Sequence, residues 1–416
     1  MNEDKKDSII KKMQQCFICE NKELRLVLSL GHQPPSNAFI KKEGLNVPEI
    51  TYPLDVFFCG ECFLVQLGYC VNKAEMFSDY VYTTGSNSSL IANFSQLVKM
   101  LIERYSLSKR DLAIDIGSND GTLLSFYKPK GVKILGIEPS SIAKMAVESG
   151  VPTMKAFFNE DTVEEIVQGH GKAKIITATN VFAHVENLHS MVKGISQLLT
   201  PDGVFVSESH HLLSLIRDNQ WDSIYHEHLR YYSLKPLMYL FNLFGLEVFD
   251  AELIGTHGGS LRVFAAKIGA YEISSNAMRI VAEEEKLGLY SFDALQKFKE
   301  KVVMHKLMIQ QMLIDIKKDG GRIMGIGAPA KGNTLLNYCN LTPDILDAIV
   351  ERSPLKIGLY TPGTHIRVED ESLLFTEQPE YGLLLSWNIA NDIIPKLKEK
   401  GFNGKIIIPI PELHCV

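Results

Sequence analysis

The sequence predicts an α/β protein whose central domain is a doubly wound, mostly parallel sheet. Three observations support this prediction. An apolar strand ends in a glycine turn within residues 112–121, strands and helices alternate after it, and a second strand runs into glycines from Arg322 onwards. With 416 residues, the chain is long enough for two or three domains.

Composition narrows the class of protein. Apolar residues make up 45% of the chain and charged residues 22%, as in ordinary soluble globular proteins. The net charge of −6 argues against a nucleic-acid partner held by general electrostatics. The sequence has no apolar run of membrane-spanning length, and its charged N-terminus lacks the apolar segment of a signal peptide. We therefore expect a cytoplasmic protein without a membrane partner.

Four of the seven cysteines form two C-x₂-C pairs, Cys16 with Cys19 and Cys59 with Cys62. This pattern is typical of a tetrahedral zinc site, and Gly60 suits the tight turn between the second pair of ligands. Two disulfides or four buried thiols are the alternatives, and a cytosolic location disfavours disulfides. Four thiolates leave no open coordination position, so the predicted zinc is structural.

Two segments of the N-terminal region are harder to interpret. Residues 31–39 are too rich in proline and small polar residues for a helix or a strand, and form either a presenting loop or a connector. In residues 79–86, tyrosines alternate with apolar residues, which indicates an extended segment with Tyr80 and Tyr82 on one side. These phenol groups either belong to the core or contact a ligand.

A helical period covers residues 90–105, and the glycine turn after the next strand points to a nucleoside site. The turn reads Asp115-Ile-Gly-Ser-Asn-Asp-Gly121, and the following strand, 133–139, ends in Glu138. A carboxylate at that position hydrogen-bonds a ribose diol in doubly wound folds. Acids flanking the glycines disfavour the pyrophosphate of NAD and suit the sulfonium of S-adenosylmethionine. The turn looks like motif I of class I methyltransferases.

Further polar residues follow the later strands. Strands are expected at 174–179 and 203–208, and Asn180 and His184 follow the first of them, where parallel sheets bind ligands. The predicted cofactor-binding residues are Asp115, Gly117, Asn119, Asp120, Gly121, Glu138, Pro139 and Asn180.

The densest polar cluster spans residues 224–233. Tyr225, Glu227 and His228 suit general-base chemistry on a carbon acid, and the H-E-x-x-H spacing of metalloproteases is absent. The glycine-rich bend around His257 precedes a strand at 261–266 and is either a substrate loop or a hairpin turn.

A pair of long helices is predicted from Ala277 to about Lys318, followed by a second glycine turn. Pro329 and Lys331 interrupt the dinucleotide fingerprint there, and Glu351 lies at the end of a later strand, so no acidic ribose partner is placed as NAD requires. A helix N-terminus near Lys331 can hold an anion such as a diphosphate. More buried strands are expected at 345–350, 381–386 and 405–409. The pattern predicts a duplicated α/β scaffold whose second copy binds a nucleotide group.

The ordered set of motifs resembles the sugar C-methyltransferases that add a 3-C-methyl branch to nucleotide-linked 4-keto sugars. It comprises the four cysteines, Gln33-Pro-Pro-Ser-Asn37, Asp115–Gly121, Tyr225-His-Glu-His228, His257-Gly-Gly-Ser-Leu-Arg262 and the glycine-rich stretch 325–334. The resemblance covers nearly the whole chain. One departure is the Thr83-Thr84 pair, where the family pattern has serines.

The resemblance implies three domains: a zinc-binding domain at 1–85, a class I methyltransferase core with a Rossmann-like sheet at 86–272, and a helical connector with a C-terminal Rossmann-like domain at 273–416. It implies His228 as the base, with Tyr225, Glu227 and His184 around the sugar. The expected substrate is a dTDP- or GDP-linked 4-keto-deoxysugar, and the expected state is a monomer or weak homodimer. The residues expected to bind the substrate are Asn37, Tyr80, Tyr82, His257, Lys331, Asn333, Thr334 and Glu351.

The residues suit this chemistry. A 4-keto group acidifies the hydrogen on C3, so His228 can remove it, Glu227 can orient the imidazole, and Tyr225 or His184 can donate to the enolate oxygen. The enolate carbon then attacks the sulfonium methyl. An NAD-dependent sugar oxidoreductase and a non-catalytic sugar-nucleotide-binding protein are the alternatives, and an O- or N-methyltransferase would need no carbon-acid base.

Overall fold

The computed structural model describes residues 10–71, 84–86 and 88–416. Tyr80 and Tyr82 lie outside the described residues, as does most of the segment 79–86 that was expected to be extended. Its described end, Thr84–Ser86, forms the 3₁₀ helix η2.

The N-terminal region forms a four-stranded antiparallel sheet in the order β11-β4-β3-β2, and β1 pairs with β5 beside it. The bounds are β1 Ile10–Lys12, β2 Leu24–Gln33, β3 Tyr52–Cys59, β4 Val65–Leu67, β5 Tyr69–Val71 and β11 Arg230–Tyr231, with the 3₁₀ helix η1 at Lys42–Gly44. We expected no strand in residues 31–39, and this is wrong for the first three of them. Strand β2 continues to Gln33, because His32 and Gln33 pair with β3, and Pro34 ends the strand.

The central sheet confirms the predicted doubly wound fold. Its order is β12-β13-β10-β9-β6-β7-β8, parallel from β10 to β8, with β13 antiparallel to both neighbours. Its strands are β6 Leu112–Ile116, β7 Lys133–Ile137, β8 Thr153–Met154, β9 Ala173–Thr179, β10 Leu199–His210, β12 Leu246–Ile254 and β13 Ser260–Lys267.

Helices cover this sheet. They are α2 Ser88–Arg104, α3 Thr122–Ser125, α4 Ala143–Glu148, α5 Glu160–His170, α6 Leu188–Leu198, α7 Leu212–Arg217 and α8 Leu234–Asn242. Short 3₁₀ helices are η3 Lys128–Lys130, η4 Trp221–Ser223 and η5 Thr256–Gly258. Because β12 and β13 pair antiparallel on either side of η5, the glycine-rich bend around His257 is the turn of a β-hairpin.

The predicted helix pair is present as α9 (Ser275–Lys286) and α10 (Phe292–Lys318). The last domain is a second α/β unit with the sheet order β16-β15-β14-β17-β18-β19. Its elements are β14 Ile323–Ile326, α11 Ala330–Tyr338, β15 Ile349–Glu351, β16 Val368–Asp370, α12 Ser372–Glu377, β17 Tyr381–Leu384, η6 Trp387–Ile389, α13 Ala390–Glu399, β18 Lys405–Ile408 and β19 His414–Cys415.

The strand expected at 345–350 begins later than predicted. The amides of Ile345 and Leu346 bond back to the Thr342 carbonyl and form a turn, so the strand starts at Ile349. The strands expected at 381–386 and 405–409 end one or two residues early, at Leu384 and Ile408.

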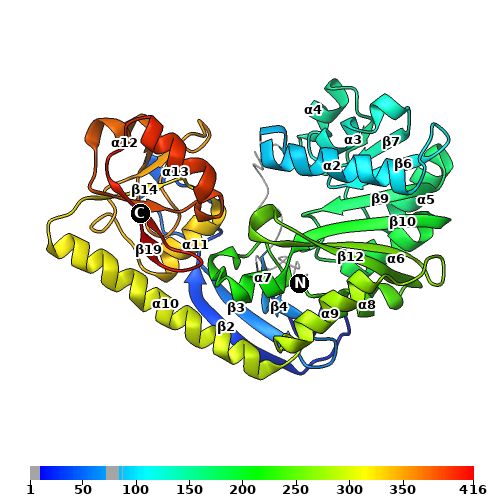
Figure 1. Ribbon diagram of the computed structural model, residues 1–416, viewed down its shortest axis with the longest axis horizontal. Coiled ribbons are helices and arrows are strands. Elements are labelled where there is room, and N and C mark those ends of the chain that lie inside the picture. Colours follow the sequence, from blue (N-terminus) through cyan, green and yellow to red (C-terminus); the bar gives the residue numbers. More distant parts are fainter. Residues whose placement is uncertain (1–9, 72–83, 87) are drawn as a thin grey trace, which may run out of the picture.

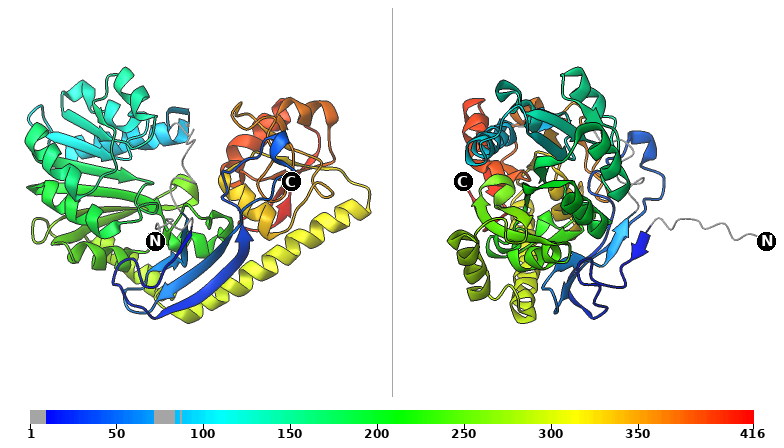
Figure 2. Two further views of the ribbon diagram at one scale, coloured as in Figure 1. Left: turned by 180° about the vertical axis from the view of Figure 1, so that it is seen from behind. Right: turned by 90° about the vertical axis from the view of Figure 1, so that its right-hand side faces the viewer.

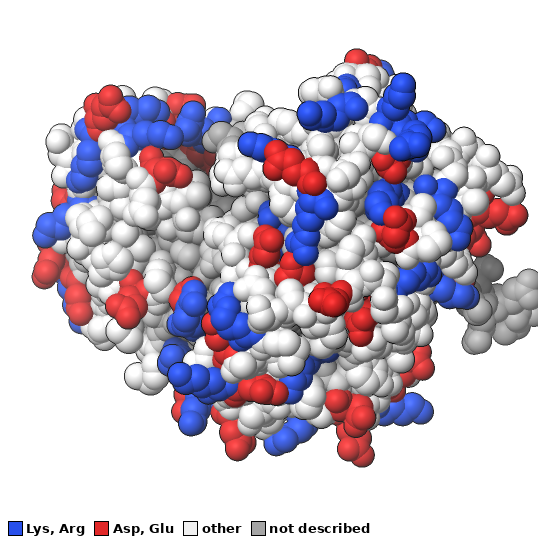
Figure 3. All heavy atoms as spheres, turned by 45° about the vertical axis from the view of Figure 1, so that its right-hand side comes forward, with Lys and Arg blue, Asp and Glu red and all other residues white. Residues whose placement is uncertain are grey.

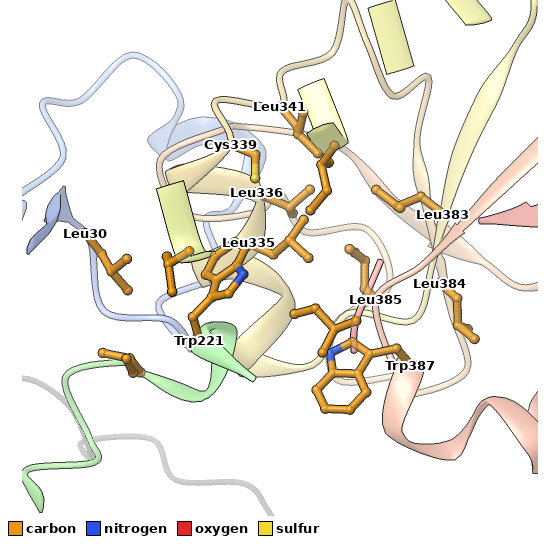
Figure 4. Packing of buried hydrophobic residues seen from close by; sticks show 14 of the residues in the cluster. Leu30, Trp221, Leu335, Leu336, Cys339, Leu341, Leu383, Leu384, Leu385 and Trp387 are labelled. Atoms are coloured by element: carbon orange, nitrogen blue, oxygen red, sulfur yellow. The ribbon is translucent and has the colours of Figure 1, made fainter. Parts of the chain in front are cut away.

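The N-terminal sheet bridges the two α/β units, which lie on either side of it with α10 running along the outside (Figure 1; Figure 2). Leu28, Leu30 and Val56 share one hydrophobic core with α10 and the C-terminal domain, whereas Cys16, Ile18 and Cys59 belong to the core of the central domain. Trp221 of the central domain lies beside Leu335 and Leu336 of α11 (Figure 4).

The surface carries both signs of charge. On the face drawn in Figure 3, lysines and arginines are interspersed with acidic residues. Within the described ranges, none of the helices combines the length and apolar character needed to cross a membrane.

Candidate active site

The turn after β6 is held by its own backbone and by Glu138. The Gly117 amide donates to Ile137 O at 2.8 Å, and the Asn119 amide donates to Glu138 Oε2 at 3.0 Å. Glu138 Oε1 accepts from the Ser140 amide at 2.9 Å. Gly117 has φ +72°, and a Cβ there would lie 2.3 Å from Val181 Cγ2, so this position requires glycine.

Asp115 lies at the end of β6, only 3% exposed, and accepts a 2.6 Å hydrogen bond from Thr177 Oγ1. Burial raises its pKa to about 7, and the Thr177 bond only partly opposes this. With Glu138 at the end of the adjacent strand β7, two poorly solvated carboxylates flank the turn. This donor set fits a cationic ligand that carries a ribose diol.

Two predicted cofactor residues have another use. Asn119 Oδ1 accepts from the Thr84 amide at 2.9 Å, and Asp120 Oδ2 accepts from the Gly85 amide at 2.7 Å. They tie the segment before α2 onto the turn. Asn180 follows β9 with φ +58°, and its backbone amide donates to Glu208 O. Pro139 follows directly after Glu138 in the chain. Gly121, at φ +80°, precedes α3.

His228 is connected to this turn through the loop after β9. Val181 contacts Gly117, the His184 amide donates to Val181 O, and the ring centroids of His184 and His228 are 5.0 Å apart. The Leu229 amide also donates to Ala183 O at 3.1 Å, which joins the Tyr225–His228 segment to the loop after β9.

The tautomer of His228 follows from its two partners. Ser223 O can only accept, so Nδ1, 2.9 Å away, carries the proton. Nε2 therefore has a free lone pair, which accepts a 2.8 Å hydrogen bond from the Tyr225 hydroxyl. Burial and the neighbouring His184 hold the pKa of His228 well below its ordinary value. His228 is thus a neutral imidazole with a basic nitrogen aimed at a phenol.

The structure corrects the predicted role of Glu227. The carbonyl of Ser223 orients His228, while Glu227 Oε1 accepts from Asn37 Nδ2 at 2.6 Å. Burial raises the pKa of Glu227 to about 7, although the Asn37 bond lowers it. The neighbouring His226 is buried against Tyr52 O.

His210 is a residue that sequence reasoning missed. It ends β10, and its Nε2 lies 2.8 Å from Gln220 Oε1, while Gln220 Nε2 donates to Gly258 O at 2.7 Å. The amide oxygen of Gln220 must then accept, so His210 Nε2 is the protonated nitrogen and Nδ1 has a lone pair. Burial lowers the pKa of His210 to about 4, and the charges of Lys331 and His257 contribute to this in smaller measure. The only sequence signal was its position at the end of a parallel strand.

Of the predicted substrate residues, Asn333 and Thr334 have side chains bonded to other domains, whereas Lys331 and His257 do not have such bonds among the described contacts. Lys331 lies 3.7 Å from the centroid of the Trp387 ring, and burial lowers its pKa to about 8. His257 is exposed at the hairpin turn. Asn333 and Thr334 are buried and already bonded across domains, to Ser36 O at 2.7 Å and Ile224 O at 3.3 Å.

Glu351 corrects the prediction that no acidic ribose partner is placed. Strand β15 lies next to β14, so Glu351 occupies the position in the second sheet that Glu138 has in the first. Its Oε2 accepts from the Ala328 amide at 2.7 Å, and its Oε1 accepts from the Ser353 amide at 3.0 Å.

The four predicted metal ligands come together. All four sulfur atoms of Cys16, Cys19, Cys59 and Cys62 lie within 4.8 Å of one another, and none is in a disulfide. The distances Cys16–Cys62 and Cys19–Cys59 are 3.4 Å. A tetrahedral site with Zn–S bonds of about 2.3 Å has sulfurs about 3.8 Å apart, so these residues fit zinc.

Comparisons with known proteins match nearly the whole chain. Three family models match: a zinc binding domain at 16–77, a methyltransferase domain at 92–251 and a C-methyltransferase C-terminal domain at 255–411. C-methyltransferase NovU of Streptomyces niveus is 33% identical over 411 residues, which cover 98% of each chain. The ubiquinone biosynthesis O-methyltransferase of Escherichia coli is 32% identical over 101 residues, 23% of this chain and 41% of that protein.

Solved structures match the chain over less than half its length. An S-adenosylmethionine-dependent methyltransferase from Clostridium acetobutylicum is 14% identical, with a TM-score of 0.35, and the match covers 47% of this chain and 96% of that one. Magnesium protoporphyrin IX methyltransferase from Synechocystis is 14% identical, with a TM-score of 0.32, covering 42% and 79%.

Proposed function

Because the chain belongs to the C-methyltransferase family, we propose that it methylates C3 of a nucleotide-linked 4-keto-deoxysugar. It is an S-adenosylmethionine-dependent enzyme with a zinc-binding N-terminal domain. The nature of the sugar, the position of the new branch and the roles of individual residues are our proposal.

The observation that carries the proposal is the state of His228. Its Nδ1 proton is committed to Ser223 O, so Nε2 is a base that cannot donate. A ketone next to the reacting carbon makes C3–H acidic enough for such a base. The low pKa of His228 keeps the imidazole neutral at neutral pH, so its Nε2 is unprotonated.

Tyr225 has a matching role. In the structure its hydroxyl donates to His228 Nε2. Substrate entering between them would break that bond and free the hydroxyl to donate to the developing enolate oxygen. His184, packed on the His228 ring, is the second donor candidate. His210, with its fixed Nδ1 lone pair, would accept a hydrogen bond from a sugar hydroxyl.

Asp115 and Glu138 would hold S-adenosylmethionine, which supplies an electrophilic methyl group for the carbanion. Asp115 suits the cationic end of that molecule, and Glu138 retains lone pairs for the ribose hydroxyls. The zinc, with four thiolates and no open position, stabilises the fold and takes no part in proton transfer.

Lys331 and Glu351 would bind the nucleotide carrier in the second α/β unit. A lysine at the start of α11 offers a cation for a diphosphate, and Glu351 has the geometry of a ribose ligand. An NAD-dependent oxidoreductase would bind its cofactor at this turn of the second α/β unit. Calorimetric titration with NAD and with S-adenosylmethionine distinguishes the two functions. Binding of NAD alone would overturn the proposal.

The direct test is exchange of the C3 hydrogen in heavy water. We expect His228→Ala to slow exchange by roughly 100-fold or more, since positioned general bases contribute about 10²–10⁴-fold. Its affinity for S-adenosylmethionine should stay unchanged. His170→Asn, at the exposed end of α5, is the matched control and should exchange like the unmodified enzyme. Undiminished exchange in His228→Ala would identify another residue as the base.

A further inference from the structure

The segment before the proposed base has little secondary structure of its own. It contains the three-residue 3₁₀ helix η4, followed by turns and irregular backbone at residues 224–229. A 3₁₀ helix this short closes few hydrogen bonds. Even so, Ser223 O of this segment lies 2.9 Å from His228 Nδ1, the contact that fixes the tautomer of His228. The position of Ser223 must therefore depend on contacts from other parts of the chain.

The C-terminal domain supplies contacts on both sides of Ser223. Trp387, the first residue of η6, donates from Nε1 to Asp222 Oδ2 at 2.6 Å. Thr334 of α11 donates from Oγ1 to Ile224 O at 3.3 Å. Ile224 and Trp387 also belong to one hydrophobic core, drawn in part in Figure 4. The residues before and after Ser223 are thus both anchored in the C-terminal domain.

Of these two anchors, the Asp222 contact is the stronger. The Asp222 side chain is fully buried, so losing its donor would leave a carboxylate poorly compensated. Burial raises the pKa of Asp222 to about 6, while the charge of Lys331 and the Trp387 hydrogen bond lower it. At neutral pH the indole N–H therefore donates to a carboxylate, and such bonds are roughly twice as strong as bonds between neutral groups. The longer Thr334 bond joins two neutral groups.

Trp387 also contacts the second glycine turn. Lys331 Nζ lies 3.7 Å from the centroid of the Trp387 ring, a cation–π contact. The same indole donates to Asp222, which precedes Ser223 in the chain. Ser223 O in turn accepts from His228 Nδ1. A continuous series of contacts therefore links the turn at Lys331 with the imidazole of His228.

We propose that Asp222 and Trp387 are positioning residues, which hold the Ser223 carbonyl against His228 from the C-terminal domain. This inference rests on the proposed function, in which His228 is the base and Lys331 binds the carrier nucleotide. Neither positioning residue has to touch the sugar. They act by keeping the proton of His228 on Nδ1, so that Nε2 stays free to accept the C3 proton. Their loss should slow proton removal and leave the affinity for S-adenosylmethionine unchanged.

The tautomer of His228 gives a test that needs no substrate. In nitrogen NMR of the zinc-loaded full chain, labelled at histidine, the His228 signals are assigned by their loss in His228→Ala. Nδ1 should be the protonated nitrogen. Trp387→Phe removes the donor but keeps a ring beside Lys331, and it should shift these signals toward the other tautomer, as should Asp222→Ala. Signals that stay in place in both variants would overturn the proposal.

Exchange of the C3 hydrogen in heavy water tests the consequence for the chemistry. Trp387→Phe and Asp222→Ala should each slow exchange about tenfold or more at saturating substrate, because a small displacement of a catalytic group costs this much in rate. Asp222→Asn keeps an oxygen that can accept the indole N–H, so it should exchange within about twofold of the unmodified enzyme. A loss in Asp222→Asn as large as that in Asp222→Ala would contradict the role of the Trp387 hydrogen bond.

Tyr381→Phe is the matched control. Tyr381 lies in β17 of the same domain, and Lys405 is 5.9 Å from the centroid of its ring. This variant should exchange like the unmodified enzyme. Exchange at the unmodified rate in Trp387→Phe would overturn the inference. Absence of exchange in the unmodified enzyme would count against the proposed function instead, and the NMR signals of His228 would still decide the positioning.

Discussion

In the central domain Gly117 follows β6, and in the C-terminal domain Gly327 follows β14. Both amides donate at 2.8 Å to a carbonyl at the end of the neighbouring strand, Ile137 O and Val350 O. The next residue in the chain is a glutamate in both domains, and each glutamate accepts two or more backbone amides around its turn. The two turns have the same backbone construction.

Their side chains differ in charge. Asp115 stands two residues before Gly117, whereas the matching position before Gly327 is Gly325, where a Cβ would lie 2.8 Å from Ile349 Cγ1. After the glycine, the first turn has Asp120 and the second has Lys331. The shared backbone therefore presents a carboxylate in both turns, while the flanking side chains are acidic in the first turn and basic in the second.

Removing the zinc should have the largest effect, because the N-terminal domain contacts both α/β units. The side chain of Asn37 donates to Glu227, and Ser36 O accepts from the side chain of Asn333. Structural zinc contributes roughly 10 kcal/mol or more to the folding of small zinc domains. Cys16→Ser should therefore lose the metal and much of its thermal stability, measured by metal analysis and calorimetry.

Cys415→Ser is the control for that experiment, since Cys415 is exposed and far from the cluster in sequence. It should keep the metal and the melting temperature. A Cys16→Ser chain that is zinc-free, stable and active would show that the domain does not depend on the ion.

Asp115→Asn should have the next largest effect. It removes the buried negative charge from the first turn, so the affinity for S-adenosylmethionine should fall by about 100-fold, or roughly 2.7 kcal/mol. Nucleotide-sugar binding should be unaffected. Asp161→Asn, exposed on α5, is the matched control. Equal loss of both ligands would mean that the two turns are not separate sites.

The same residue predicts a pH dependence. Burial raises the pKa of Asp115 to about 7, and only the carboxylate attracts the cation. Affinity for S-adenosylmethionine should therefore fall as the pH drops below about 7, by up to tenfold per unit, and Asp115→Asn should flatten this profile. For folding the sign is opposite: the raised pKa stabilises the protein at low pH, and this contribution is lost as the pH rises through about 7. A profile that Asp115→Asn leaves unchanged would assign the dependence elsewhere.

Lys331→Met should have the smallest effect and should act on the second turn only. Without the ammonium group, we expect the KM for the nucleotide sugar to rise about tenfold, because one charge contact to a diphosphate is lost. Lys306→Met is the control, since Lys306 also lies over an aromatic ring, that of Tyr338, but on α10. A change in affinity for S-adenosylmethionine would contradict the assignment of Lys331 to the nucleotide.

Local patterns predicted much of this molecule. Each C-x₂-C pair, the first glycine turn and the α9–α10 pair depend on residues close in sequence, and the structure contains all of them as expected. The position of Glu351 was misjudged because adjacency in a sheet is not visible in the chain. Long-range pairing also extended β2 to Gln33 beyond what its composition indicates.

The candidate site was harder to predict for the same reason. His210 gains its fixed tautomer from Gln220 and Gly258, which come from two other segments. Asn333 and Thr334 are polar residues at a glycine turn, yet their side chains bond across domains. Such hydrogen bonds depend on tertiary contacts, so composition and spacing cannot predict them.

We propose that two turns with the same backbone construction bind two different ligands. Calorimetric titration of Glu138→Gln and Glu351→Gln with S-adenosylmethionine and with the nucleotide diphosphate tests it most directly. Glu138→Gln should lose affinity for S-adenosylmethionine and keep that for the nucleotide, and Glu351→Gln should do the reverse. Loss of S-adenosylmethionine binding in Glu351→Gln, with Glu138→Gln unaffected, would contradict the account.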